Sequence, residues 1–176
     1  MYAFRDGTQT TPLAFPGPFP LSRGSPGMQP ILHAVGTQFG LTSKPDNGWY
    51  DDLPGGATGQ RIVVPPQAAI SVVAYVGTSP QTDPCLTGQT ANIYARSFAT
   101  GASLLDNGGG TPLESVASAE GAVGLEIVGF DTAPGASQPD IRLAITLGTT
   151  GEVTFVNVAL PPNLAGHRMS WRLLGQ

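Results

Sequence analysis

The chain has 176 residues, and it combines 24 Gly and 17 Pro with only 8 basic and 12 acidic side chains. This length fits one domain and a small appendage. A net charge of −4 without any basic cluster argues against nucleic-acid binding, which uses surfaces rich in Lys and Arg.

The abundance of Gly and Pro disfavours long helices, because inside a helix Gly costs about 1 kcal/mol and Pro about 3 kcal/mol relative to Ala. The same residues suit tight turns, and the Val- and Ile-rich stretches between them suit pleated sheet. The composition therefore predicts an all-β fold. We expect an extended arm over residues 1–30 and a single β domain over residues 31–176.

The arm is rich in proline and also carries bulky apolar side chains. Its prolines fix the backbone near the polyproline conformation and remove hydrogen-bond donors, so it is expected to be extended and neither helix nor central strand. A solvated linker is normally polar, whereas this segment contains Phe15, Phe19 and Leu21. These side chains need a surface to lie on, either the chain's own β domain or a neighbouring subunit.

The first half of the β domain alternates candidate strands with loops. The expected strands are 31–35 (ILHAV), 61–64 (RIVV), 69–76 (AISVVAYV) and 91–98 (ANIYARSF), with a long Gly-rich loop over 36–60. The third strand is mostly apolar, which is typical of a strand covered on both faces or at an interface. The fourth alternates, but its pattern leaves open which face points inward.

One short helix is expected in the middle of the domain. Thr111 stands as a helix N-cap, Pro112 follows at the first helical position, and Glu114 comes at the third, which together make a capping signature. Gly121 supplies a stop. This pattern predicts two to three helical turns that cover one end of the sheet.

The second half of the domain contains the most regular strand patterns. Further strands are expected at 123–130, 141–147, 152–160 and 168–174. Every second residue of 141–147 is a large aliphatic one, and a Gly-Thr-Thr-Gly turn leads into the next strand, so residues 141–160 are predicted to form a hairpin. About eight short strands and one short helix favour a jelly-roll-like β-sandwich over a closed barrel.

The sequence shows no catalytic or metal-binding set. Histidine and cysteine often serve in such sites, and the chain has two histidines, His33 and His167, and one cysteine, Cys85. They lie far apart in the sequence, whereas a metal site needs three or four convergent ligands. A calcium site around Asp46, Asp51 and Asp52 is an alternative, although this loop lacks the spaced acidic pattern of an EF-hand. We expect no enzyme activity, no metal and no cofactor.

The location of the protein is predicted from what its sequence lacks. The N-terminus has no basic start and apolar core of a secretory signal, and the single cysteine allows no internal disulfide. No apolar run approaches the roughly 20 residues of a membrane-spanning helix, so no membrane contact is expected. These features predict a protein that is made in a cytoplasm.

Two aromatic residues follow the Asn-Gly turn in the long loop, Trp49 and Tyr50. Exposed aromatic side chains on a loop stack on sugar rings or anchor protein interfaces. Alternatively, the two rings fold back and close the end of the sandwich. The candidate partner-binding residues are therefore Phe15, Phe19, Leu21, Trp49 and Tyr50.

The overall plan resembles small accessory proteins of tailed-bacteriophage particles. The resemblance consists of a proline-studded arm, MYAFRDGTQTTPLAFPGPFPL, followed by a β region that ends in RMSWRLLGQ. It implies a head decoration (cement) protein of the virion that is often trimeric and binds the major capsid protein of the shell. A tail, baseplate or fibre component is an alternative, and a carbohydrate-binding β-sandwich that uses Trp49 and Tyr50 is another.

Overall fold

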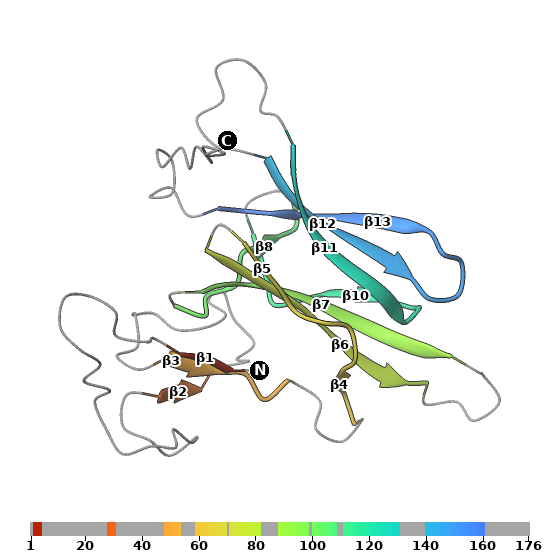
Figure 1. Cartoon of the computed structure of the whole chain (residues 1–176), viewed down its shortest axis with the longest axis horizontal. Helices are drawn as coiled ribbons and strands as arrows, with labels where there is room; N and C mark the ends of the chain where they lie inside the picture. Colours follow the sequence, from red (N-terminus) through yellow and green to blue (C-terminus); the bar gives the residue numbers. More distant parts are fainter. Residues whose placement is uncertain are drawn as a thin grey trace, which may run out of the picture.

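The structure is a computed structural model, and it describes residues 2–4, 28–30, 48–53, 59–69, 71–81, 88–98, 100–108, 111–130 and 140–160. Within these residues the chain is all-β: two five-stranded antiparallel sheets pack against each other as a β-sandwich, and a small three-stranded sheet lies beside them (Figure 1). The β-sandwich predicted from the sequence is confirmed.

The first sheet, here called the β6 sheet, is built on two nine-residue strands. These are β6 (Val72–Pro80) and β7 (Gln89–Ser97), which pair along their whole length. The short strand β10 (Val116–Ser118) pairs with β7 on one side. On the other side, β4 (Arg61–Ile62) and β5 (Gln67–Ala69) pair with successive parts of β6. Pro65 and Pro66 stand between these two strands and have no backbone donor, which interrupts the edge of the sheet.

The second sheet, here called the β12 sheet, contains the predicted hairpin. Its long strands are β11 (Ala122–Phe130), β12 (Asp140–Leu147) and β13 (Val153–Val158), which form an antiparallel meander. The short strands β8 (Leu105–Asp106) and β9 (Pro112–Leu113) extend it beyond β13. The pairing of β12 with β13 confirms the hairpin over 141–160.

The core lies between the inner faces of these two sheets. Alternate residues of each long strand point inward, and they include Val72, Ala74, Val76, Ala91, Ile93, Ala95, Leu125, Ile141, Leu143 and Ile145. On β13 the buried residues are Val156 and Val158, whereas Val153 and Phe155 are about half exposed on the outer face. The period-2 pattern of β12 therefore predicted its buried face correctly.

One side of the sandwich is closed by the segment that leaves β7. Ser103 forms a bridge with Arg96 of β7, and Leu105 pairs with Val158 of β13. In addition, the Leu104 N–H donates to the Ala95 carbonyl, and the Leu104 carbonyl accepts from Ala159. This short segment thus hydrogen-bonds to both sheets.

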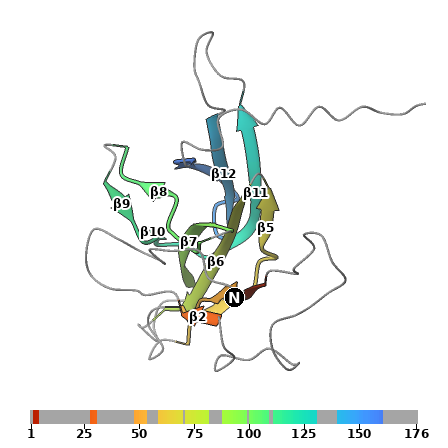
Figure 2. The ribbon, with the colours of Figure 1, turned by 90° about the vertical axis from the view of Figure 1, so that its left-hand side faces the viewer.

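A third layer lies on the outer side of the β6 sheet. Its strands are β1 (Tyr2–Phe4), β3 (Gly48–Tyr50) and β2 (Met28–Pro30), with β3 in the centre, antiparallel to β1 and parallel to β2. In Figures 1 and 2 the strands β6 and β7 lie between this layer and the strands β11 and β12. We call residues 2–4, 28–30 and 48–53 the N-terminal layer.

The short helix predicted from Thr111 is wrong: the described residues 111–120 form β9 and β10 instead. The capping signature is present, but tertiary contacts decide the conformation. Leu113 pairs with Leu105, and its carbonyl accepts a 2.6 Å hydrogen bond from the Ser103 hydroxyl. Val116 pairs with Ile93, so the segment passes from one sheet to the other and supplies a short strand to each.

Two other elements differ from the expectation. The predicted loop over 36–60 contains β3, and the predicted strand over 69–76 is divided between β5 and β6. Ser71 lies at this division with a φ of 64°, which a strand does not tolerate. The predicted strands at 31–35 and 168–174 lie outside the described residues.

Candidate functional site

The outer face of β6 and β7 is polar and aromatic, yet it is buried. Val73 and Tyr75 lie on this face of β6, and Tyr94 and Arg96 lie on it in β7, with Tyr75 paired to Tyr94 and Val73 paired to Arg96. All four are buried, although none belongs to the core cluster between the two sheets. The N-terminal layer covers them.

Trp49 of β3 is one of the described side chains that join the layer to the sandwich. It has no exposed surface. Its indole Nε1 donates a 2.9 Å hydrogen bond to the carbonyl of Phe98, the residue that follows β7. An indole placed in this way contributes a large apolar contact and a satisfied polar atom.

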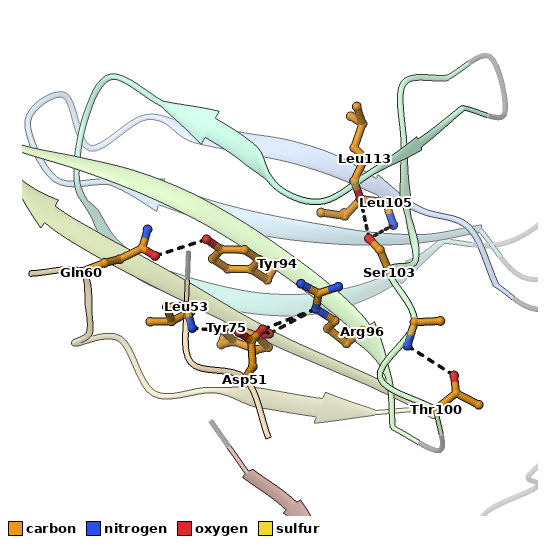
Figure 3. Close-up of polar contacts among 11 residues, drawn as sticks. Asp51, Leu53, Gln60, Tyr75, Tyr94, Arg96, Thr100, Ser103, Leu105 and Leu113 are labelled. Atoms are coloured by element: carbon orange, nitrogen blue, oxygen red, sulfur yellow. Dashed lines mark hydrogen bonds and ion pairs between the residues drawn. The ribbon is translucent and has the colours of Figure 1, made fainter. Parts of the chain in front are cut away.

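Asp51 is the second of these side chains, and it forms the centre of a buried polar cluster (Figure 3). Its Oδ1 accepts a 2.9 Å hydrogen bond from the Leu53 N–H. Its Oδ2 accepts a hydrogen bond from the Tyr75 hydroxyl and lies 3.5 Å from Nε of Arg96. Arg96 Nε in turn donates to the Tyr75 hydroxyl oxygen at 3.3 Å.

The two tyrosines of this face stack on each other. Their ring centroids are 5.1 Å apart with an interplanar angle of 16°, and the Arg96 guanidinium carbon lies 5.8 Å from the centre of the Tyr94 ring. The Tyr94 hydroxyl donates to Oε1 of Gln60, and Gln60 Nε2 donates to the carbonyl of Gly77. Aromatic stacking and the cation–π contact therefore add to the hydrogen bonds.

Burial changes the proton affinity of both tyrosines. Desolvation raises the pKa of Tyr75 far above its ordinary value, and the neighbouring charge of Asp51 raises this pKa further. Desolvation also raises the pKa of Tyr94 to about 12. Both hydroxyls are therefore neutral donors at any physiological pH.

Arg96 is incompletely satisfied. Its Nη1 and Nη2 are buried and have no hydrogen-bond partner among the described residues. A guanidinium presents five N–H donors. Burying these donors without acceptors costs free energy, because they lose their hydrogen bonds to water. The Asp51 carboxylate balances the charge of Arg96, but it occupies only the Nε side.

The chemistry of this cluster is structural. Asp51, Tyr75 and Arg96 are fully buried, so none of them meets a solvent-borne substrate in this arrangement. Within the described ranges, no group of three or more His, Cys, Asp or Glu residues is placed to hold a metal ion. In the same part of the chain, no helix has the length and apolar character needed to cross a membrane.

The candidate partner-binding residues fall into two groups. Trp49 is buried and Tyr50 is half-buried, both in β3. The buried Trp49 ring has no free face for a sugar, which argues against a carbohydrate-binding platform here. Phe15, Phe19 and Leu21 lie outside the described residues, between β1 and β2 in the chain.

Sequence reasoning missed the partners of Asp51. The sequence suggested Asp51 only as a calcium ligand. It placed Tyr94 and Arg96 on one face of a strand but did not show which face points inward. The signal that was available is the alternation of Tyr94 and Arg96 in ANIYARSF, opposite a strand that is apolar on both faces. That combination predicts that another segment covers the outer face of the sheet as well, but it does not show which segment this is.

The outer face of the β12 sheet is less covered. Phe155 and Val153 of β13 are 51% and 47% exposed. Beyond them on the same face, Arg142 donates from Nη2 to Asp140 Oδ2 at 2.6 Å. The two outer faces of the sandwich therefore differ: the described N-terminal layer covers one, and the other presents apolar side chains to the surroundings.

Comparison of the chain with models of protein families, with curated proteins and with solved structures found no match.

Proposed function

We propose that this chain is a structural virion protein, a decoration (cement) protein that binds an assembled shell and stabilises it. Support comes from the β-sandwich with its buried polar cluster and from the low share of charged residues, 11% of the chain. A surface with few charges loses less hydration when it packs against another subunit.

The observation that carries the proposal is the way in which the proline-rich segment is held. Residues 2–4 and 28–30 pair with opposite edges of β3. The intervening residues 5–27, which include Phe15, Phe19 and Leu21, are therefore attached at both ends to one strand. Because neighbouring strands lie about 4.8 Å apart, the two ends are roughly 10 Å apart across β3.

A segment fixed at both ends loses less conformational entropy on binding than a free arm does. The strand that holds it is itself fixed to the sandwich through Trp49 and Asp51. We infer that residues 5–27 are a presented binding segment and that Phe15 and Phe19 are its anchors on a neighbouring virion subunit, the major capsid protein in our proposal. Several copies on a symmetric shell, as trimers in our proposal, add their affinities through avidity.

The proposal is tested with the double variant Phe15→Ser/Phe19→Ser and with shells of the virus that encodes the chain, stripped of accessory proteins. We expect the variant to cosediment with shells at least about 10-fold more weakly than the unchanged chain, because buried aromatic anchors dominate interface energies. Phe98→Ser is the matched control, since Phe98 is exposed but lies outside the segment.

Each outcome of this experiment has a meaning. Undiminished shell binding by the double variant overturns the role of the segment. Binding of the unchanged chain to isolated tails and not to shells overturns the decoration role in favour of the tail, baseplate or fibre alternative.

A further inference from the structure

The connection from β8 to β9 begins with an asparagine followed by a glycine, Asn107-Gly108. The two strands pair side by side at one side of the sandwich (Figure 2), and both residues of this dipeptide are exposed. Surface connections are reached by water and are more mobile than the strands that they join. An asparagine in such a place is open to attack by the backbone nitrogen of the next residue, and a glycine there has no side chain to hinder the attack.

The nitrogen of Gly108 is held beside a carboxylate. Its N–H donates a 2.6 Å hydrogen bond to Oδ1 of Asp106, the last residue of β8. An amide nitrogen is a weak nucleophile while it keeps its proton, so its attack requires a base that takes this proton. Oδ1 of Asp106 lies within the distance at which a side chain accepts a proton in a transition state.

The side-chain carbonyl of Asn107 is held by a donor. Its Oδ1 accepts a 3.2 Å hydrogen bond from the N–H of Thr111. The Asn107 N–H in turn donates to the Thr111 carbonyl at 3.1 Å, which fixes the two residues across the connection. When a nucleophile adds to Cγ of Asn107, negative charge develops on Oδ1. The Thr111 N–H stabilises this charge in the way that a donor of an oxyanion hole does.

Gly108 also has the backbone freedom that ring closure needs. Its φ is 80°, a conformation that glycine adopts without strain. Among the described residues, no atom lies within 4 Å of the place that a Cβ on Gly108 would occupy. Bonding of the Gly108 nitrogen to Cγ of Asn107 requires rotation about bonds of Asn107, and the described surroundings of Gly108 leave room for it.

We propose that Asn107 is a site of self-modification, at which the chain converts this asparagine to aspartate or isoaspartate. The Gly108 nitrogen forms a bond to Asn107 Cγ and gives its proton to Asp106. The bond between Cγ and Nδ2 breaks, and Nδ2 leaves as ammonia with the proton that Asp106 returns. Water then adds to one of the two carbonyl carbons of the cyclic imide and opens the ring, which gives aspartate or isoaspartate.

The product differs from the unmodified chain in charge and in backbone length. It carries one more negative charge, next to that of Asp106, and these like charges repel each other. Isoaspartate also adds one carbon atom to the backbone between β8 and β9, which pair through Leu105 with Leu113 and Asp106 with Pro112. Hydrolysis of the amide is not reversed in solution, so the loop records the age of the chain. This chemistry does not depend on the shell binding proposed above.

The chain contains its own matched control, because the tripeptide Asp-Asn-Gly occurs twice. In the other copy, Asp46-Asn47-Gly48, the glycine is the first residue of β3 and pairs with Phe4 on one side and Met28 on the other. The local chemistry of the two copies is the same, but the backbone of Gly48 is held between two strands. Ring closure at Asn47 is therefore expected to require local opening of the sheet.

The test measures modification at both sites in the full-length chain. The chain is incubated in neutral buffer, folded or denatured, and is then digested for peptide mass spectrometry and an isoaspartate methyltransferase assay. In the folded chain we expect Asn107 to convert at least about 10-fold faster than Asn47, because pairing restrains only Gly48. In the denatured chain, where only local sequence acts, we expect the two rates to be similar.

A variant at position 106 tests the role of the carboxylate. Asp106→Ser keeps an oxygen that supports the turn but removes the base, so we expect conversion of Asn107 to slow by at least about 10-fold. Should circular dichroism show a disturbed fold, Asp106→Asn takes its place, since it preserves the shape of the side chain. Glu126→Gln is the control: it removes a carboxylate from an exposed residue of β11, and we expect an unchanged rate.

Three results overturn the proposal. One is that Asn107 stays unmodified in the folded chain while it converts in the denatured chain. Another is that Asn47 and Asn107 convert equally fast in the folded chain, which would mean that local sequence alone decides. The last is that a folded variant at Asp106 converts at the unchanged rate. Failure of the unmodified chain to bind shells refutes only the proposed function.

Discussion

Asp51 and Arg96 illustrate what a single buried charge pair does in this molecule. Both side chains are excluded from solvent, and they come from residues that lie on either side of β6 in the chain. Bringing two ions out of water costs several kcal/mol each, and their mutual attraction and hydrogen bonds offset that cost only while both are present. The pair is consequently weak evidence for high stability, but it fixes the position of the N-terminal layer.

Removing one partner of this pair is expected to destabilise the protein strongly. Asp51→Asn leaves Arg96 buried without a counter-charge among the described residues, which costs about 3–5 kcal/mol. For a chain of this length that is a drop of about 10 °C in the melting temperature, measured by circular dichroism.

The control for this prediction is Asp52→Asn, which makes the same chemical change at the exposed neighbouring position. We expect it to alter stability by less than about 0.5 kcal/mol. Equal effects of the two substitutions would contradict the buried cluster and indicate a general response to the loss of one negative charge.

Alkaline pH is expected to act through Tyr75 and Tyr94. Both have a raised pKa in the folded chain, that of Tyr94 at about 12 against an ordinary value of 10.0. A tyrosine whose pKa is raised by folding stabilises the folded state fully below its unfolded pKa. This contribution is lost as the pH rises from about 10 through 12.

Tyrosinate absorbance checks this prediction. Near pH 11 the tyrosinate absorbance of the folded chain should be smaller than that of the denatured chain. This difference should be smaller in Tyr94→Phe. Circular dichroism on the same samples shows whether the late titration accompanies unfolding. A folded chain with the same titration curve as the denatured chain would contradict the burial of these hydroxyls.

At the scale of elements, long regular patterns were predictable and short irregular elements were not. The alternation in β12 and the Gly-Thr-Thr-Gly turn predicted the β12–β13 hairpin, because one face of that strand is buried and the other is not. The strands β9 and β10 have two and three residues, and their sequence carries a helix-capping signature. Their conformation depends on Ser103, Leu105 and Ile93, which lie elsewhere in the chain, so local propensity did not reveal it.

The candidate site follows the same rule. That Tyr94 and Arg96 share one face of β7 was readable from their spacing, since side chains alternate along a strand. That this face is buried depends on Trp49 and Asp51, which reach it from β3 and the residues after it. The contact joins segments 45 residues apart for the Asp51–Arg96 pair, and no pattern within either segment specifies the other.

At the scale of the whole molecule, the structure changes what a truncation tests. Deleting residues 1–30 removes β1 and β2 and leaves β3 without partners on either edge, so it disturbs the cover over Arg96 as well as the binding segment. Deleting residues 1–53 removes the whole layer, and it leaves every residue of the sandwich core in place. The second deletion is therefore the cleaner experiment.

We expect the chain without residues 1–53 to fold as a sandwich and to unfold cooperatively, because the core cluster between the two sheets contains none of the layer residues whose burial the structure describes. In this variant water reaches the Arg96 guanidinium. Its charge is therefore hydrated, whereas in Asp51→Asn the same charge is buried without a counter-charge among the described residues. The exposed Tyr75 and Tyr94 present a new apolar face, which should bind a hydrophobic dye, and their hydroxyls should titrate at a lower pH than in the full chain. Adding the separate segment 1–53 should reverse both changes, because it supplies Trp49 and Asp51 again. Loss of cooperative unfolding in the truncated chain would instead mean that layer and sandwich form one folding unit.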